Sequence, residues 1–333
     1  MDKVKVAVLG AGSWGTALAI RLAANGHKVK LCCFDKSQQE KLASDRMNME
    51  YLPEIVFPNT LSIHPFKDSV VSDCDYCLIA VPSVGFASTL HAFYNSLSNL
   101  GHVIWATKGM DPDTHKLLSN LVKDVFSDNF KFAVLTGPSF AGEVGKGMPT
   151  AVSVASNNPD LALKVQGLFH CQVFRTYVCD DYIGAQVGGA LKNVIAIATG
   201  IIDGLNYGAN ARAALITRGL AEIRRLGLKL GAQSQTFMGL SGMGDLVLTC
   251  TDNQSRNRRF GLYLGQGLTK EQAFEEIKQV VEGYETVNTM YDFANNLGVE
   301  MPITVAVYNI LYKGESAKDA VIKLLSREAK NEF

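Results

Sequence analysis

The sequence predicts an α/β fold with a doubly wound parallel sheet over residues 1–182, followed by an all-helical domain over residues 183–333. Three observations predict this organisation. Short apolar runs alternate with helical patterns in the first part, and the strand-like runs stop near residue 182. The length of 333 residues is also enough for two domains. Strand–helix alternation is typical of a parallel sheet whose functional loops lie at its carboxyl edge.

The first domain begins with a strand, a glycine turn and a helix. The apolar run 5–10 ends in a glycine, and the helical pattern 13–26 stops at Asn25-Gly26. A second strand is expected over 27–34, and a later helix around 114–125. Further strands are expected over 75–81, 102–107, 132–137, 151–156 and 173–178.

The second domain is expected to be helical throughout. In the pattern 211–226, Asn210 is the expected N-cap and Gly227 the expected end. The complete set of expected helices is 186–203, 211–226, 233–250, 256–265, 270–279, 283–297 and 303–313.

Composition excludes several classes of protein. Lys+Arg and Asp+Glu are equal at 32 each, which disfavours a general nucleic-acid or membrane binder. No run of about 18 apolar residues predicts a membrane span, and the N-terminus has no signal-peptide pattern. Seven cysteines without such a signal indicate a reducing cytoplasm. Cys74 and Cys77 form a C-x-x-C at the start of an expected strand, which we interpret as packing, and no metal is expected.

A glycine-rich loop connects the first strand to the first helix. Gly10-Ala11-Gly12-Ser13-Trp14-Gly15 has the G-x-G-x-x-G pattern of dinucleotide-binding loops in the structural context that this pattern requires. Gly10 permits the turn, Gly12 allows the backbone to approach a pyrophosphate, and Gly15 allows close helix–strand packing. The helix N-terminus adds free N–H groups and partial positive charge.

Asp35 lies 20 residues beyond Gly15, at the end of the second expected strand. An acidic residue there is expected to bind the ribose 2′-hydroxyl of NAD and to repel a 2′-phosphate, unless a cation such as Lys36 intervenes. The alternative is that Asp35 caps the next helix.

Three polar clusters interrupt the apolar second domain. They are Lys192-Asn193, Ser241–Asp245 with Thr249 one turn later, and Ser255–Arg259. Each has a structural alternative: Lys192 reaching solvent, Asp245 as an N-cap, and the arginines as a solvated helix start. Together they supply a proton carrier, a carboxylate partner and an anion site, the set that hydride transfer to a phosphorylated substrate needs.

Nearly the whole chain resembles the bacterial NAD(P)-dependent glycerol-3-phosphate dehydrogenases. The motifs that carry the resemblance are Gly10–Ala19, Val81–Ser83, Ala106–Gly109, Gly137–Ala141, Ala190–Val194, Asn210–Gly219, Gly244–Leu246, Thr249–Thr251 and Ser255–Asn257.

The resemblance implies reduction of dihydroxyacetone phosphate to sn-glycerol 3-phosphate with NAD or NADP as cofactor, and a product that feeds phospholipid synthesis. It also implies a Rossmann-like domain joined to a helical domain like that of 6-phosphogluconate dehydrogenase, in a cytoplasmic homodimer. The alternatives are a related β-hydroxyacid or 6-phosphogluconate-type dehydrogenase, and a non-catalytic dinucleotide-binding sensor.

The resemblance also assigns roles residue by residue. Lys192 matches the catalytic proton carrier. The positions that match substrate contacts are Lys108, Gly137, Ser139, Lys192, Asn193, Asp245, Thr249, Ser255, Arg256 and Asn257. Those expected to contact the cofactor are Gly10, Gly12, Ser13, Trp14, Gly15, Phe34, Asp35, Lys108, Ala141, Arg256, Val280 and Glu282.

One position departs from the family. A Trp-x-Arg-Asp pattern usually ends the second strand, whereas this chain has Cys32-Cys33-Phe34-Asp35. Phe34 therefore replaces the arginine expected to accommodate a 2′-phosphate. We predict that NADH is used at least as well as NADPH.

Overall fold

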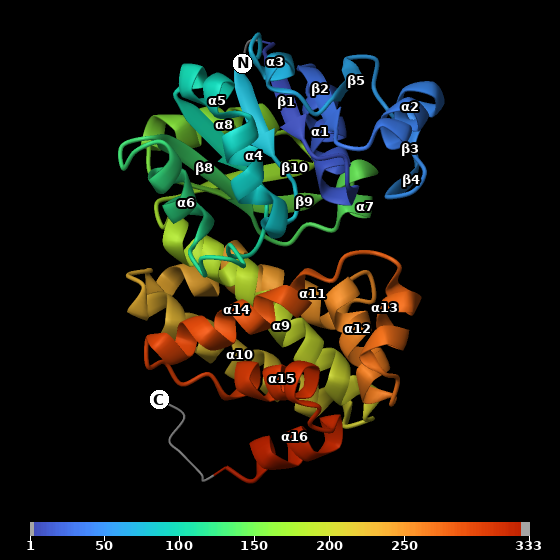
Figure 1. The fold of residues 1–333 in the computed structure, drawn as a ribbon, viewed down its shortest axis with the longest axis vertical. Coiled ribbons are helices and arrows are strands. Elements are labelled where there is room, and N and C mark those ends of the chain that lie inside the picture. The colour runs from blue at the N-terminus through green and yellow to red at the C-terminus, as the bar shows by residue number, and fades with distance from the viewer. Residues whose placement is uncertain (1–2, 328–333) are drawn as a thin grey trace. The chain divides into compact units, whose positions relative to one another are not determined.

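A computed structural model describes residues 3–327 of the chain (Figure 1). The chain forms two compact units: residues Met1–Asp111 with Lys116–Gln186, and Pro112–His115 with Val187–Phe333. Each unit has its own architecture. The domain boundary expected between residues 182 and 183 stays a prediction.

The first unit is built on an eight-stranded sheet, in the order β10-β9-β8-β7-β6-β1-β2-β5. The strands are β1 (Lys5–Leu9), β2 (Lys28–Cys33), β5 (Leu61–Pro65), β6 (Tyr76–Ile79), β7 (His102–Trp105), β8 (Lys131–Thr136), β9 (Thr150–Ser156) and β10 (Phe174–Cys179). The five neighbouring pairs from β5 to β8 are parallel, which confirms the predicted fold class.

The sheet is not parallel throughout, which corrects the prediction. β9 pairs antiparallel with β8, and β10 then pairs parallel with β9. Between β8 and β9 the chain has only the five-residue helix α7 (Ala141–Gly145). A parallel crossover normally needs a longer helix that runs back along the sheet, so this short connection returns the chain in the opposite direction.

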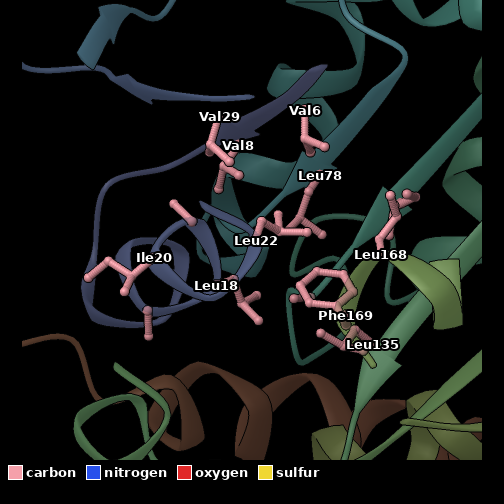
Figure 2. Close-up of a cluster of buried hydrophobic side chains, with 14 of the residues drawn as sticks. Val6, Val8, Leu18, Ile20, Leu22, Val29, Leu78, Leu135, Leu168 and Phe169 are labelled. Atoms are coloured by element: carbon pink, nitrogen blue, oxygen red, sulfur yellow. The ribbon is translucent and has the colours of Figure 1, made fainter. Parts of the chain in front are cut away.

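Helices cover both faces of this sheet because its strands are apolar on both sides. In β1, Val6 and Val8 belong to the hydrophobic cluster on one face, while Ala7 and Leu9 belong to the cluster on the other. Figure 2 shows the first cluster, in which Leu18 and Leu22 of α1 gather with Val8, Leu78 and Phe169. The helices of this unit, apart from α7, are α1 (Ser13–Ala24), α2 (Lys36–Asp45), α3 (Asp68–Val71), α4 (Phe86–Ala92), α5 (Tyr94–Leu100), α6 (Leu118–Val125) and α8 (Pro159–Phe169), with a 3₁₀ turn at Ser83–Gly85.

Three strands were not expected from the sequence. β3 (Met47–Asn48) and β4 (Leu52–Val56) form a small antiparallel pair, and β5 lies at the edge of the main sheet. Their side chains are mostly half-buried or exposed, so they lack the apolar run that marks a central strand. The helix expected from Thr114 begins only at Leu118.

The second unit is helical, as expected. Its helices are α9 (Tyr182–Gly204, which begins in the first unit), α10 (Gly208–Lys229), α11 (Asp245–Thr251), α12 (Arg256–Gly265), α13 (Lys270–Ile277), α14 (Glu282–Asn296), α15 (Pro302–Lys313) and α16 (Ala317–Leu325). α16 was not expected. Asn210 is wrong as an N-cap and Gly227 is wrong as an end, because α10 begins at Gly208 and continues to Lys229.

The segment expected as one helix over 233–250 is divided. It contains a 3₁₀ turn (Ser234–Met238), a π-helical turn (Leu240–Gly244) and then α11. A side chain on Gly242 would lie 2.3 Å from the carbonyl oxygen of Phe237, so this turn requires glycine. The three glycines at 239, 242 and 244 favour such an irregular turn over a continuous helix.

α9 packs against α12 with the two backbones in close contact. A Cβ added to Gly200 would lie 2.0 Å from the carbonyl oxygen of Arg258, and one added to Gly261 would lie 2.0 Å from that of Ile197. α9 is long and apolar enough to cross a membrane by length and composition, but its most apolar window is 100% buried within the protein. It is therefore the central helix of this unit.

Candidate active site

The glycine loop has the geometry that the sequence predicts. Gly10 has φ +114°, and a Cβ there would lie 2.8 Å from the carbonyl oxygen of Ala80. A Cβ on Gly15 would lie 2.0 Å from the carbonyl oxygen of Gly10, so neither position accepts a side chain. At Gly12, by contrast, an added Cβ meets nothing within 4 Å. The loop thus leaves open space beside the N-terminus of α1, which fits a pyrophosphate.

Several of the predicted residues of the first unit lie together. Lys108 donates from Nζ to the carbonyl oxygen of Gly137 at 3.2 Å, and the Ser139 hydroxyl donates to the same oxygen at 2.9 Å. Lys108 Nζ also lies 6.0 Å from the centre of the Trp14 ring. The structure therefore brings Trp14, Lys108, Gly137 and Ser139 to one place, and Ala141 follows as the first residue of α7.

The end of β2 is exposed. The side chain of Phe34 is 87% exposed and makes an edge contact with Phe66, with ring centres 5.9 Å apart. Asp35 caps α2, because its carboxylate accepts the backbone N–H of Gln38 at 2.6 Å. The capping alternative is thus confirmed, while ribose binding by the same exposed carboxylate stays a prediction. Lys36 Nζ lies 3.9 Å from the Glu40 carboxylate.

The second unit contains a buried ion pair. Lys192 of α9 donates from Nζ to the carboxylate of Asp245, and their side chains are 8% and 1% exposed. Lys192 does not reach solvent, so that alternative is wrong. Asp245 is not the N-cap of α11 but its first residue, with Gly244 as the cap. A charged pair in such a place is costly unless it is well partnered.

Polar neighbours complete this cluster. The Thr249 hydroxyl donates to the Asp245 carbonyl oxygen at 2.6 Å and lies 3.5 Å from its carboxylate. Asn193 donates from Nδ2 to the Glu282 carboxylate at 3.5 Å. Burial raises the pKa of the Cys250 thiol to about 12, so this neighbour of the ion pair is unreactive.

The predicted anion cluster at the start of α12 contains residues with different tasks. The Ser255 hydroxyl accepts the N–H of Arg258 as the N-cap, and Asn257 Oδ1 accepts the N–H of Gly283 at 2.8 Å. Arg258 is buried and pairs with Asp203, which Arg212 also contacts at 2.9 Å. Within residues 3–327, the guanidinium of Arg256 makes no hydrogen bond or ion pair. Arg256 is thus available to an anion, whereas Arg258 holds the fold together.

Two further predicted residues lie just before or at the start of α14. Val280 is 58% exposed, and Glu282 is the first residue of the helix. Among the described residues, no group of three or more His, Cys, Asp or Glu side chains is arranged to hold a metal ion. Within residues 3–327 the cysteines form no disulfide, and Cys74 and Cys77 are buried as packing predicts.

The sequence did not single out Asn48 or Gln38, which both contact the glycine loop. Each donates a side-chain amide hydrogen to the carbonyl oxygen of Ala11. Neither residue lies in a recognisable motif, and Asn48 belongs to the unexpected strand β3. Only the three-dimensional contact identifies them.

Comparison with known proteins covers both units. Residues 5–162 match the model of the NAD-dependent glycerol-3-phosphate dehydrogenase N-terminus, and residues 181–322 match that of the C-terminus. A glycerol-3-phosphate dehydrogenase [NAD(P)+] of Colwellia psychrerythraea is 51% identical over 98% of both chains. One of Actinobacillus pleuropneumoniae is 50% identical over 100% of this chain and 99% of its own.

Solved structures agree with these sequence matches. The crystal structure of glycerol-3-phosphate dehydrogenase from Coxiella burnetii is 42% identical, covers 98% of this chain and 99% of its own, and has a TM-score of 0.92. A ketopantoate reductase from Ralstonia eutropha shares the fold, at 14% identity and a TM-score of 0.60 over 95% of this chain and 99% of its own. The matches to the two family models and to the full-length relatives exclude the β-hydroxyacid and 6-phosphogluconate alternatives. This chain belongs to the NAD-dependent glycerol-3-phosphate dehydrogenase family.

Proposed function

We propose that this chain catalyses the reversible reduction of dihydroxyacetone phosphate to sn-glycerol 3-phosphate with NADH or NADPH. Family membership supports the reaction, and one observation carries the mechanism. Lys192 is a buried ammonium on a mostly apolar helix, and its partner Asp245 is also buried. Such a pair is expensive to keep for stability alone, because apolar residues of similar size are often at least as stabilising.

Lys192 is the proton carrier in this proposal. The bound reduced nicotinamide supplies the hydride for the carbonyl carbon of the substrate. The Lys192 ammonium gives its proton to the C2 oxygen and stabilises the negative charge that develops there. In the reverse direction Lys192 Nζ takes the proton back. Asp245 holds the ammonium in place, and Thr249 fixes Asp245 through the bonds described above.

The phosphate group of the substrate is assigned to the start of α12. Arg256 is the first residue of this ten-residue helix, where unpaired N–H groups and the helix dipole favour an anion. Its guanidinium can bind two phosphate oxygens at once. Ser255, Asn257 and Asn193 are assigned to the same substrate, together with Lys108, Gly137 and Ser139 of the first unit.

The cofactor is assigned to the glycine loop and its surroundings. Gly10, Gly12, Ser13, Trp14 and Gly15 form the pyrophosphate part of the site, and Ala141, Val280, Glu282 and Arg256 are further contacts. Phe34 and Asp35 face the adenosine ribose. An exposed phenyl ring and a carboxylate offer no cation to a 2′-phosphate, so we propose that NADH is used at least as well as NADPH.

We further propose that the enzyme acts in the cytoplasm as a homodimer and that its product supplies phospholipid synthesis. The support is the family membership and, for the compartment, the seven cysteines, which form no disulfide within residues 3–327.

One direct assay, run with each of the two cofactors, tests the function. The loss of NADH absorbance is followed with dihydroxyacetone phosphate as the acceptor, and the assay is repeated with NADPH. Turnover with kcat/KM for NADH at or above that for NADPH is expected. A kcat/KM for NADPH about tenfold higher, a difference of about 1.4 kcal/mol, would contradict the cofactor assignment. NADH binding without turnover would instead identify the sensor alternative.

A further inference from the structure

The glycine loop is held by side chains from outside its own motif. The carbonyl oxygen of Ala11 accepts two amide hydrogens, one from Asn48 Nδ2 at 2.9 Å and one from Gln38 Nε2 at 3.1 Å. This oxygen lies between the first two glycines of the loop. Its orientation therefore determines how the centre of the loop faces a ligand.

The Asn48 side chain makes three hydrogen bonds and uses both of its amide hydrogens. It is 1% exposed, and its second amide hydrogen goes to the Thr16 hydroxyl at 2.8 Å. Its Oδ1 accepts the backbone N–H of Tyr51 at 3.2 Å. Rotating the amide by half a turn would place Oδ1 against the Ala11 carbonyl oxygen, where two acceptors repel, so the contacts determine the orientation.

The fixed oxygen also determines the direction of an N–H group. In a planar trans peptide the C=O and the N–H point in opposite directions, so the N–H of Gly12 points away from Asn48 and Gln38. Among residues 3–327 this N–H has no hydrogen-bond acceptor, and a Cβ on Gly12 would meet nothing within 4 Å. The Gly12 N–H is thus unpaired within the described residues, at the N-cap of α1.

Without these two amides the peptide would lose its preferred orientation. Glycine tolerates both positive and negative φ, so a peptide next to Gly12 can turn over at little steric cost. The turned-over peptide would present a carbonyl oxygen where a phosphate needs a donor.

We propose that Asn48 is a positioning residue for the dinucleotide: together with Gln38 it locks the Ala11–Gly12 peptide so that the Gly12 N–H meets a cofactor phosphate. The proposal rests on the assignment of the loop to NAD(H) made above. Asn48 acts through the backbone of the loop and needs no contact with the cofactor.

Gln38 connects the hydrogen bonds at the Ala11 carbonyl oxygen to the ribose side of the proposed cofactor site. The Cys33 thiol donates to Gln38 Oε1 at 2.8 Å, and the Asp35 carboxylate accepts the Gln38 backbone N–H. The end of β2, which carries Phe34 and Asp35, and the glycine loop are therefore held in register by one glutamine side chain.

The test compares Asn48→Leu with a matched control at the C-cap of α1, Asn25→Leu. Asn25→Leu also removes two amide hydrogen bonds, to the carbonyl oxygens of Leu168 and Phe169 at 2.9 and 3.0 Å, but at the other end of α1. We expect Asn48→Leu to raise the Kd for NADH about tenfold, the effect of one lost hydrogen bond of ordinary strength. The KM for dihydroxyacetone phosphate and the kcat at saturating NADH should stay within about twofold.

The control separates positioning from loss of stability. Asn25→Leu should lower the Tm but leave the Kd for NADH unchanged. An equal rise of the Kd in both variants, or no rise in Asn48→Leu, overturns the proposal. If Asn48→Leu does not fold, the half-exposed Gln38→Leu decides: a Kd for NADH raised about threefold supports the proposal and an unchanged Kd overturns it. Failure of the unmodified enzyme to bind NADH would overturn the proposed function itself.

Discussion

Lys192 and Asp245 illustrate how one pair of side chains can affect both stability and catalysis. Removing one partner of a buried ion pair leaves an uncompensated charge, which typically costs 3–5 kcal/mol. A simple truncation of Lys192 would therefore impair both the fold and the proton transfer. The two effects separate only when both charges are removed together.

Lys192→Ala should lower kcat by about 10²–10⁴-fold, the usual contribution of a general acid. The measurement is kcat at saturating NADH and dihydroxyacetone phosphate. The double variant Lys192→Met/Asp245→Asn serves as the control, because it leaves no unpaired charge at these two positions. It should regain much of the lost Tm and remain as inactive as Lys192→Ala. Near-normal turnover in either variant would exclude Lys192 as the proton carrier.

Arg256→Ala should chiefly raise the KM for dihydroxyacetone phosphate, because the guanidinium makes no bond within residues 3–327 and is assigned to the phosphate. A loss of a charge-assisted contact of about 1.5–3 kcal/mol corresponds to roughly a ten- to hundredfold rise. Arg259→Ala, in the same helical turn, is the matched control and should leave this KM unchanged. Steady-state kinetics that show an unaltered KM for Arg256→Ala would remove the phosphate assignment.

Phe34→Arg should shift the cofactor preference toward NADPH. The new cation would stand beside Asp35, where a 2′-phosphate is otherwise repelled. We expect kcat/KM for NADPH to rise about tenfold, with kcat/KM for NADH changed less. Phe34→Leu controls for loss of the ring alone and should not raise NADPH use. The ratio of the two kcat/KM values is the decisive quantity.

For individual residues, the sequence predicted some functional roles and missed others, and each outcome has a physical reason. Lys192 was found because an ammonium is out of place in an apolar helix. Arg256 and Arg258 cannot be distinguished by spacing, since only the contact with Asp203 shows that Arg258 is structural. Asn48 was missed because its role depends on a contact 37 residues away in the chain.

Among the elements, the pair α9 and α12 shows the strongest constraint. Four glycines lie at the contact, namely Gly204 and Gly265 in addition to Gly200 and Gly261. A Cβ added to Gly204 would lie 2.4 Å from the carbonyl oxygen of Leu262, and one added to Gly265 would lie 2.2 Å from that of Ile201. Any side chain at these positions must push the helices apart. The result is a main-chain contact between the helix of Lys192 and the helix of Arg256.

Gly261→Ala should therefore destabilise the protein by about 1–3 kcal/mol, the usual cost of overpacking. The favourable helix propensity of alanine offsets less than about 1 kcal/mol of this cost. Chemical denaturation measures the free energy of unfolding. Gly85→Ala is the control, since its Cβ would make only ordinary contacts at 3.7 Å or more. A Gly261→Ala variant as stable as the unmodified protein would show that the helices can separate at no cost.

The sequence predicted elements well where hydrophobic pattern decides and poorly where chain connections decide. The central strands and most of the helices of the second unit were found from their apolar patterns. The direction of β9 was missed, because it depends on the length of the connection through α7. The segment 233–250 was misread because its apolar pattern continues through glycines that form a π-helical turn.

For the molecule as a whole, a buried carboxylate makes stability depend on pH. Glu222 of α10 accepts the N–H groups of Ile303 and Thr304 at the start of α15, at 2.6 and 3.2 Å. Burial raises the pKa of Glu222 from 4.5 to about 7, although these hydrogen bonds act in the opposite direction. The folded protein therefore holds this proton at a pH where the unfolded chain has lost it.

The direction in which the free energy of unfolding changes with pH follows from this difference in bound protons. Between about pH 4.5 and pH 7 the native state binds more protons than the unfolded state, so the free energy of unfolding falls as the pH rises, by on the order of 3 kcal/mol. Glu222→Gln should remove this part of the fall. Denaturation at a series of pH values measures it, with the exposed Glu275→Gln as the control that keeps the slope. If the free energy of unfolding changes equally with pH in the unmodified protein, Glu222→Gln and Glu275→Gln, Glu222 ionises normally.

The fold class was predictable because it depends on the order of many elements, and no single misread segment alters it. The family was recognised from long ordered motifs such as Asn210–Gly219, which a lone glycine loop could not replace. The two matched family models cover both of these regions.

The glycine contact between α9 and α12 has a consequence for substrate choice. Since main chain touches main chain, the distance from the Lys192 amine to the start of α12 is held constant. Reshaping neighbouring side chains will not lengthen it. A phosphorylated ketone with an extra carbon would have to be accommodated by the side chains at the start of α12, such as Arg256, or by substitutions that move α9 and α12 apart.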